Sequence, residues 1–385
     1  MKILHIYRTY YPETQGGLEE VIRQICINTK ELGTESKVFC LADQATENPI
    51  SREEALVYQS KRHLEISSCD ISFTCLPEFK RLVDWADLVH YHYPWPYADL
   101  LHFMSQVDKP SVLTYHSDIV RQRALSIIYS PLKNAFLQSV DRIVCTSTNY
   151  FATSSTLTKF QDKVDVIPIG LDDIVVGQSA SDTLSLANAL IGQPYFLFVG
   201  VLRYYKGLHI LLDAMVNAPY RVVIVGSGPT EKALKEQASR LKLDNVTFAG
   251  RVSDAEKFQL LSGARGVVFP SYLRSEAFGV TLLEGAMFGK PLISTEVGSG
   301  TSHVNIHGKT GIVVAPGSAK SLRTAMDRLY REPKVAARMG QDARDRYLKM
   351  FTGKQMGQRY LSLYEELAGT AEVAQNSPKE RVQRN

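Results

Sequence analysis

Short apolar runs alternate with helix-period segments along most of this chain. The runs are rich in β-branched residues and often end in Gly, Pro or His, which is typical of buried strands. The predicted strands are 3–7, 37–41, 88–91, 111–115, 142–145, 164–167, 195–199, 221–225, 246–248, 266–269 and 291–294. The predicted helices are 18–32, 97–106, 125–140, 208–218, 230–241, 255–261, 280–288, 319–330, 336–350 and 354–368. Such alternation predicts an α/β protein with parallel sheets covered by helices on both faces.

A chain of 385 residues is too long for one ordinary core and predicts two domains. We expect two doubly wound domains, 1–175 and 190–350, joined near 170–193, where the stretch 172–193 is polar and weakly patterned. The last helix, about 354–368, is expected to pack back on the first domain. Residues 370–385 have no core face and are predicted to form a disordered tail. Ligands of such sheets bind beyond the carboxyl ends of the strands, so a cleft between two facing domains is the expected site.

The composition is that of a soluble globular protein, with 44% apolar and 22% charged residues. No signal-like or membrane-spanning segment is recognised, and the five cysteines form no metal-type pair, so we expect reduced thiols and a cytoplasmic location. Residues 1–180 contain 17 Lys and Arg against 22 Asp and Glu, and the rest contain 27 against 18. The basic second half would suit an anionic ligand such as a nucleoside diphosphate, or an anionic membrane surface. The alternative is that these charges are scattered over solvated helices without a function.

The most specific motif is SEAFGVTLLEGA, residues 275–286, in which Glu276 and Glu284 flank seven residues. Gly279 is expected to begin a helix, and Gly289 with Pro291 to end it. Helix-start amides have no intrahelical acceptors and favour anions. Glu276 could accept hydrogen bonds from sugar hydroxyls and Glu284 from a ribose diol. The alternative is two surface glutamates on an amphipathic helix.

This motif resembles the E-x7-E signature of retaining glycosyltransferases of family 4, and the resemblance extends from residue 1 to about 368. It implies the GT-B fold, two Rossmann-like domains facing a central cleft, with an N-terminal acceptor domain and a C-terminal nucleotide-sugar domain. It also implies that Glu276 contacts the donor sugar and Glu284 the ribose. The donor sugar and diphosphate would be lined by backbone groups of Phe278, Gly279, Val280 and Thr281.

A second motif, VGVLRYYKG at residues 199–207, places two cations between a strand and a helix. Arg203 and Lys206 could stabilise the charge that a leaving diphosphate gains. Members of the family usually carry Arg directly after the glycine, where this chain has Val201. Lys206 matches the family pattern, whereas Arg203 is displaced by two residues.

Three further motifs fall at predicted strand ends. Gly16 and Gly17 permit close backbone approach before a helix, and resemble the family's N-terminal glycine loop that meets the donor phosphates. His116 could bond the donor sugar or act near the reacting centre. The pair His90 and His92 could suggest a metal, but no third ligand with suitable spacing is visible, and we interpret the pair as a cleft wall near the acceptor.

The GSGP loop at 226–229 resembles a dinucleotide fingerprint, but Glu231 stands at the third glycine position, which disfavours an oxidoreductase. In family 4 this loop, with Gly228, and the segment with Arg251 and Val252 lie around the nucleotide. No Asp-x-Asp triplet occurs, so we expect no protein-held metal and no tightly bound cofactor.

Within the family, residues 202–207 and 300–305 resemble bacterial O-antigen mannosyltransferases. This resemblance implies GDP-mannose as donor and an undecaprenyl-diphosphate-linked oligosaccharide as acceptor, with peripheral contact at the inner membrane and no nucleic acid. The alternatives are a UDP-sugar donor, a GT-B sugar-nucleotide epimerase and a non-catalytic partner subunit. No obvious covalent nucleophile is present, and the family resemblance implies a front-face retaining path.

Overall fold

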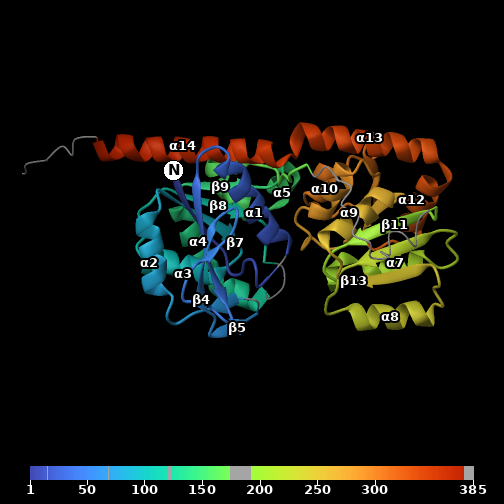
Figure 1. Ribbon diagram of the computed structural model, residues 1–385, viewed down its shortest axis with the longest axis horizontal. Helices are drawn as coiled ribbons and strands as arrows, with labels where there is room; N and C mark the ends of the chain where they lie inside the picture. Colours follow the sequence, from blue (N-terminus) through green and yellow to red (C-terminus); the bar gives the residue numbers. More distant parts are fainter. Residues whose placement is uncertain (15, 68, 120–122, 174–191, 377–385) are drawn as a thin grey trace, which may run out of the picture. The chain divides into compact units, whose positions relative to one another are not determined.

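The computed structural model describes residues 1–385 except 15, 68, 120–122, 174–191 and 377–385 (Figure 1). It divides into two compact units, each with its own parallel sheet. Unit 1 comprises 1–145, 155–167 and 353–385, and unit 2 comprises 146–154 and 168–352. Much of the stretch expected to join the two domains, 170–193, lies outside the described residues.

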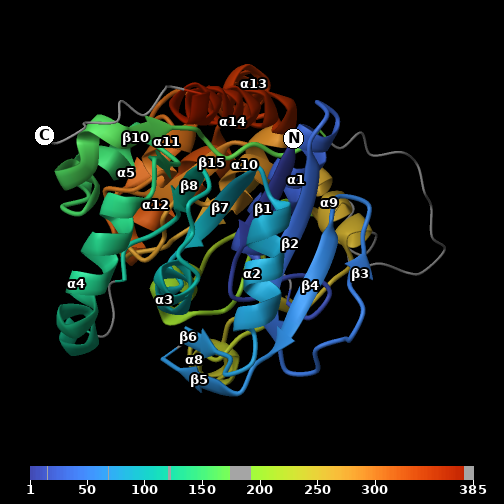
Figure 2. The same ribbon diagram turned by 90° about the vertical axis from the view of Figure 1, so that its left-hand side faces the viewer.

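The sheet of unit 1 has eight strands, and all its strand pairs are parallel except that of β3 with β4. In order across the sheet they are β10 (Val164–Val166), β9 (Arg142–Cys145), β8 (Ser111–Tyr115), β7 (Leu88–Tyr93), β1 (Lys2–Ile6), β2 (Glu35–Ala42), β4 (Leu56–Lys61) and β3 (Ile50–Ser51). Figure 2 shows the central strands side by side. The chain leaves β1 toward β2 and later returns on the other side to β7, so the strand order reverses between β1 and β7.

The helices of unit 1 cover both faces of this sheet because alternate strand residues are apolar on each face. They are α1 (Gly17–Lys30), α2 (Leu76–Trp85), α3 (Pro96–Met104), α4 (Arg123–Ser139) and the last helix, α14 (Gly353–Asn376), together with the 3-10 helix η1 (Leu157–Lys163) and a separate hairpin of β5 (Leu64–Ile66) and β6 (Cys69–Ile71). Although it follows unit 2 in the sequence, α14 packs against α1, and its Tyr360 and Tyr364 are buried on the sheet of unit 1. The helix continues to Asn376, so the disordered tail predicted from residue 370 begins too early.

Unit 2 has six parallel strands in the order β13 (Val246–Gly250), β12 (Arg221–Val225), β11 (Tyr195–Val199), β14 (Gly266–Phe269), β15 (Leu292–Thr295) and β16 (Gly311–Val314). Its helices among the described residues are α5 (Thr148–Thr153), η2 (Tyr204–Lys206), α7 (Leu208–Ala214), α8 (Glu231–Arg240), α9 (Asp254–Gly263), α10 (Val280–Met287), α11 (Thr301–Val304), α12 (Ala319–Arg331) and α13 (Pro333–Met350). The order reverses between β11 and β14. No helix among the described residues has the length and apolarity needed to cross a bilayer.

Candidate functional site

The reversal point of the unit 2 sheet brings two predicted motifs together. The loop after β11 carries Lys206, and the loop after the neighbouring strand β14 carries Glu276. Connections leave adjacent strands in opposite directions at such a point, which leaves an opening beyond their carboxyl ends where ligands of open α/β sheets bind. The sheet topology therefore places Lys206 and Glu276 where a ligand of unit 2 is expected.

Lys206 and Glu276 form a direct ion pair, with the lysine Nζ 2.5 Å from Oε2 of the glutamate. Only 13% and 9% of their side-chain surfaces are exposed, and the hydroxyl of Ser271 donates a second hydrogen bond to Glu276 at 3.1 Å. The lysine ammonium also lies 4.7 Å from the centroid of the Phe269 ring. A cation and a carboxylate are thus held side by side, one suited to an anion and one to hydroxyl groups.

Two glycines set the backbone of these loops. Gly207 follows Lys206 with φ +70°, and a Cβ there would lie 2.1 Å from the carbonyl oxygen of Pro270, so the first loop touches the second at this residue. Gly279 precedes α10 with φ +90°, which lets the chain turn directly into the helix. Thr281 then bonds through its hydroxyl to the carbonyl of Val199 at 3.0 Å, which fixes the helix start against β11.

The predicted donor-lining residues 278–281 occupy that helix start, and their side chains divide by burial. The Phe278 ring is 4% exposed and packs near Phe351, so only its backbone is available to a ligand. Val280 begins α10, and its amide with that of Thr281 lies in the first turn, where anions are stabilised.

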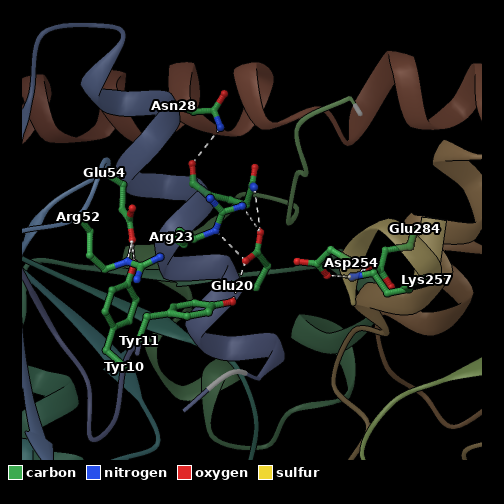
Figure 3. A network of polar contacts seen from close by, with 11 residues as sticks. Tyr10, Tyr11, Glu20, Arg23, Asn28, Arg52, Glu54, Asp254, Lys257 and Glu284 are labelled. Atoms are coloured by element: carbon green, nitrogen blue, oxygen red, sulfur yellow. Dashed lines mark hydrogen bonds and ion pairs between the residues drawn. The ribbon is translucent and has the colours of Figure 1, made fainter. Parts of the chain in front are cut away.

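Glu284 lies further along α10, where its Oε1 forms an ion pair with Nζ of Lys257 on α9 at 2.9 Å (Figure 3). Lys257 also pairs with Asp254 at 2.9 Å. Burial lowers the pKa of Lys257, but the two carboxylates outweigh this and raise the pKa above its usual range. Sequence reasoning missed Lys257, because nothing in the α9 sequence shows that the helix packs beside α10.

The remaining predicted residues of unit 2 lie around the same sheet edge. The side chain of Arg203 is exposed, and its guanidinium neither donates a hydrogen bond to the described part of the chain nor forms an ion pair with it. Gly228 lies so close to Leu202 that a Cβ would come within 2.6 Å of its carbonyl oxygen. Arg251, just after β13, bonds Ser227 at 2.9 Å, and Val252 follows it.

In unit 1, Gly16 and Gly17 lead into α1 after β1. Gly16 is extended (φ −143°), and a Cβ there would lie 2.5 Å from Oε2 of Glu19. The hydroxyls of Thr9 and Thr14 donate to that carboxylate at 3.0 and 2.9 Å. The next residue, Glu20, pairs with Arg23 (Figure 3). The start of α1 is thus acidic, and its amides are the groups that could meet an anion.

His116 follows β8 and lies at the end of a cluster of four histidines. His5 on β1 is the register partner of His90 on β7, and His92 and His116 continue the same face of the sheet. His90 and His92 are 0% and 2% exposed, so the prediction of a cleft wall is wrong; these rings are interior. The sequence analysis also overlooked His5 as a possible third metal ligand beside His90 and His92. Its position could not be predicted because the register between parallel strands cannot be read from one sequence.

One ring nitrogen from each of His5, His90 and His92 lies within 4.8 Å of the other two. Both nitrogens of His90 are already in hydrogen bonds, at 2.7 Å to Thr114 and 2.7 Å to Tyr364. Burial lowers the pKa of each ring, to about 3 for His5 and His116 and well below 6.5 for His90 and His92. The cluster is therefore composed of neutral imidazoles at physiological pH.

Family models match both halves of the chain: "Glycosyltransferase Family 4" over residues 15–174 and "Glycosyl transferases group 1" over 187–346. A D-rhamnosyltransferase of Pseudomonas aeruginosa is 47% identical over 91% of this chain and 92% of its own length. An "O-antigen chain mannosyltransferase C" of Escherichia coli is 44% identical over 95% and 99%. A solved sucrose-phosphate synthase of Thermosynechococcus elongatus has a TM-score of 0.77 at 21% identity, with 96% and 99% of the two chains covered.

Proposed function

Since this chain belongs to the family 4 glycosyltransferases and has the two α/β domains of the GT-B fold, we propose that it moves a hexose from a nucleoside-diphosphate sugar onto a lipid-linked oligosaccharide of O-antigen synthesis. The observation that carries the proposal is the Lys206–Glu276 pair at the reversal point of the unit 2 sheet. It offers a cation for the diphosphate and a carboxylate for the sugar within one small volume.

The donor is GDP-mannose in this proposal. Support comes from the two relatives, whose names specify mannosyl and D-rhamnosyl transfer. D-rhamnose is 6-deoxy-mannose, so both sugars share the configuration of the ring carbons and differ only at C6. A site that recognises the ring hydroxyls would accept either sugar, and GDP-D-rhamnose is therefore the first alternative, with UDP-sugars after it.

The residues divide the chemistry as follows. The bond between the sugar C1 and the diphosphate oxygen breaks, and the acceptor hydroxyl oxygen bonds to C1 on the same face, so the configuration is retained. The leaving diphosphate takes the proton of that hydroxyl. Lys206, the amides at the start of α10 and the exposed Arg203 stabilise the charge on the diphosphate. Glu276 accepts from sugar hydroxyls, and Glu284 from the ribose.

The Lys206–Glu276 contact engages one N–H of the ammonium and one oxygen of the carboxylate. An ammonium has three donors and a carboxylate two acceptor oxygens, so Lys206 can also donate to the diphosphate and Glu276 can also accept from sugar hydroxyls. His116 and the glycine loop of unit 1 are proposed to contact the donor sugar and its phosphates. Lys257 keeps the Glu284 carboxylate in place for the ribose.

The test is a donor panel. Wild-type protein is incubated with GDP-mannose, GDP-D-rhamnose and UDP-glucose, with and without an undecaprenyl-diphosphate-linked oligosaccharide, and nucleoside diphosphate release and product mass are followed. We expect acceptor-dependent GDP release and a product longer by one or more hexoses, also in EDTA. Epimer or free sugar without acceptor would instead show an epimerase. Binding without turnover on any acceptor would show a non-catalytic subunit.

A further inference from the structure

Three of the clustered histidines form a continuous hydrogen-bonded chain across three strands of unit 1. The Nδ1 of His5 lies 3.1 Å from Nε2 of His92, and the Nδ1 of His92 lies 3.1 Å from Nε2 of His116. The rings are nearly parallel in both steps, 22° apart with centroids at 5.4 Å. His90 stacks on His92 but bonds elsewhere, so it is a neighbour of the chain and not a link in it.

Such a chain has only two arrangements of protons when every ring is neutral. Each N···N contact needs one protonated and one bare nitrogen, and each neutral ring carries one proton. If His5 donates through Nδ1, His92 must also be protonated at Nδ1, and so must His116. If His116 donates through Nε2, the order reverses and His5 carries its proton on Nε2. The tautomer of the innermost ring therefore fixes that of the outermost one.

The surroundings of His5 choose between the two arrangements. Its Nε2 is buried and has no hydrogen-bond partner among the described residues, and the whole residue is 0% exposed. A buried N–H without an acceptor is rarer and less favourable than a bare nitrogen there. The arrangement with a proton on Nε2 of His5 is thus disfavoured. Each hydrogen bond is then donated in the direction from His5 to His116. His116, the most exposed of the three rings at 5%, therefore has its proton on Nδ1.

We propose that His5 and His92 are positioning residues that hold His116 in its Nδ1–H tautomer, so that this ring offers a ligand a hydrogen-bond donor at the carboxyl end of β8. The inference rests on the proposed function for the identity of that ligand, an oxygen of the donor sugar. Free imidazole side chains favour the opposite tautomer, with the proton on Nε2. The hydrogen bonds from His5 through His92 therefore change the tautomer that His116 would otherwise prefer. The chain ends at His5 and leads to no further described acceptor, so it orients a group and does not carry protons away.

The test is nuclear magnetic resonance of the ligand-free, full-length protein with ¹⁵N-labelled histidine at pH 7. The pattern of ring couplings reports which nitrogen of each ring is protonated, and single His→Gln variants assign the signals. We expect His5, His92 and His116 all to be protonated at Nδ1 and bare at Nε2. A His116 that is protonated at Nε2, or at both nitrogens, would overturn the proposal.

Two substitutions test the dependence. His92→Phe cuts the chain, and the His116 signal should move to the Nε2–H tautomer. His90→Phe is the matched control, because it removes an equally buried ring from the same face and leaves the chain intact, so the His116 tautomer should stay. A His116 that remains Nδ1–H in His92→Phe would refute the positioning role.

An activity measurement adds the functional step. With the donor identified in the panel, turnover should fall about 10-fold in His92→Phe, the scale of one hydrogen bond to substrate. Unchanged turnover together with a switched tautomer would contradict the role of His116 Nδ1–H toward the donor. If wild type turns over no donor, the proposed function fails, while the tautomer spectrum still decides the positioning.

Discussion

At the scale of single residues, the ion pair between Lys206 and Glu276 is the feature that sequence reasoning did not foresee. Both residues were predicted as site residues from their motifs, yet a motif does not say that two loops meet. They meet because β11 and β14 are neighbours in the sheet, although 66 residues of sequence lie between the end of β11 at Val199 and the start of β14 at Gly266. Lys257 was missed for the same reason, since α9 and α10 are brought together only by the fold.

The cation pair Arg203 and Lys206 yields a double-mutant prediction. If both stabilise the leaving diphosphate, Arg203→Ala and Lys206→Ala each lower kcat, and the double variant loses less than the product of the two because both cations act on one charge. Steady-state kinetics of the three variants measures this. A kcat within about threefold of wild type in Arg203→Ala, roughly 0.7 kcal/mol, would remove Arg203 from the site.

Glu284 and Lys257 give a prediction about donor binding. A ribose contact is made equally in the ground and transition states, so Glu284→Gln should raise the donor KM about 10-fold with little change in kcat. Lys257→Met should raise KM less, because the carboxylate remains but loses its partner. In the double variant, the donor KM should be little higher than in Glu284→Gln alone. A fall in kcat at unchanged KM would give Glu284 a catalytic or structural role instead.

At the scale of elements, the central strands and most helices could be predicted, whereas the segment from 43 to 86 could not. β1, β7, β8 and β11 are short apolar runs that are buried on both faces, and their predicted bounds lie within two residues of the observed ones. β4 is half polar (LVYQSK) because it lies near the sheet edge, and its pattern resembles a loop. The edge strand β16 was also missed.

The histidine face of the unit 1 sheet predicts how stability depends on pH. The folded pKa of His5 and of His116 is lowered to about 3 from 6.5, so the unfolded chain binds more protons below pH 6.5 and stability falls as the pH drops through that window. Each such ring contributes about 1.4 kcal/mol per pH unit, or about 2 kcal/mol between pH 6.5 and 5.

Urea unfolding at pH 7.5 and pH 5.0 measures this effect. We expect a clearly lower free energy of unfolding at pH 5.0 in the wild type, and a smaller difference in His5→Phe, which has one fewer ring to protonate. Equal pH dependence in the two proteins would show that His5 does not stay neutral in the fold.

At the scale of the whole molecule, charge is unevenly divided between the units. Unit 1 contains 22 Lys and Arg against 24 Asp and Glu, a net charge of −2, whereas unit 2 contains 22 against 16, a net charge of +6. The C-terminal helix belongs to unit 1, so the sequence halves do not coincide with the units. The positive charge of unit 2 fits a nucleotide ligand and also attraction to anionic lipid.

Membrane attachment through this charge should be peripheral and sensitive to salt. Attraction of exposed charges falls as ionic strength shortens the screening length from about 10 Å at 0.1 M to about 3 Å at 1 M. Protein bound to vesicles that contain an anionic phospholipid should therefore be released by 1 M NaCl, and neutral vesicles should bind less, as measured by co-sedimentation. Release only by detergent would contradict this account.

The central claim is that the carboxylate of Glu276 takes part in glycosyl transfer, and the rate of Glu276→Gln tests it most directly. Acceptor-dependent GDP release from GDP-mannose is compared in wild type, Glu276→Gln and the control Glu332→Gln, which breaks the exposed Arg328–Glu332 pair instead. Melting curves check that each variant is folded, and we expect a lower Tm for Glu276→Gln because the largely buried Lys206 loses its charged partner. We predict at least a ~100-fold lower rate in Glu276→Gln and a normal rate in the control. A near-normal rate in folded Glu276→Gln would contradict the account.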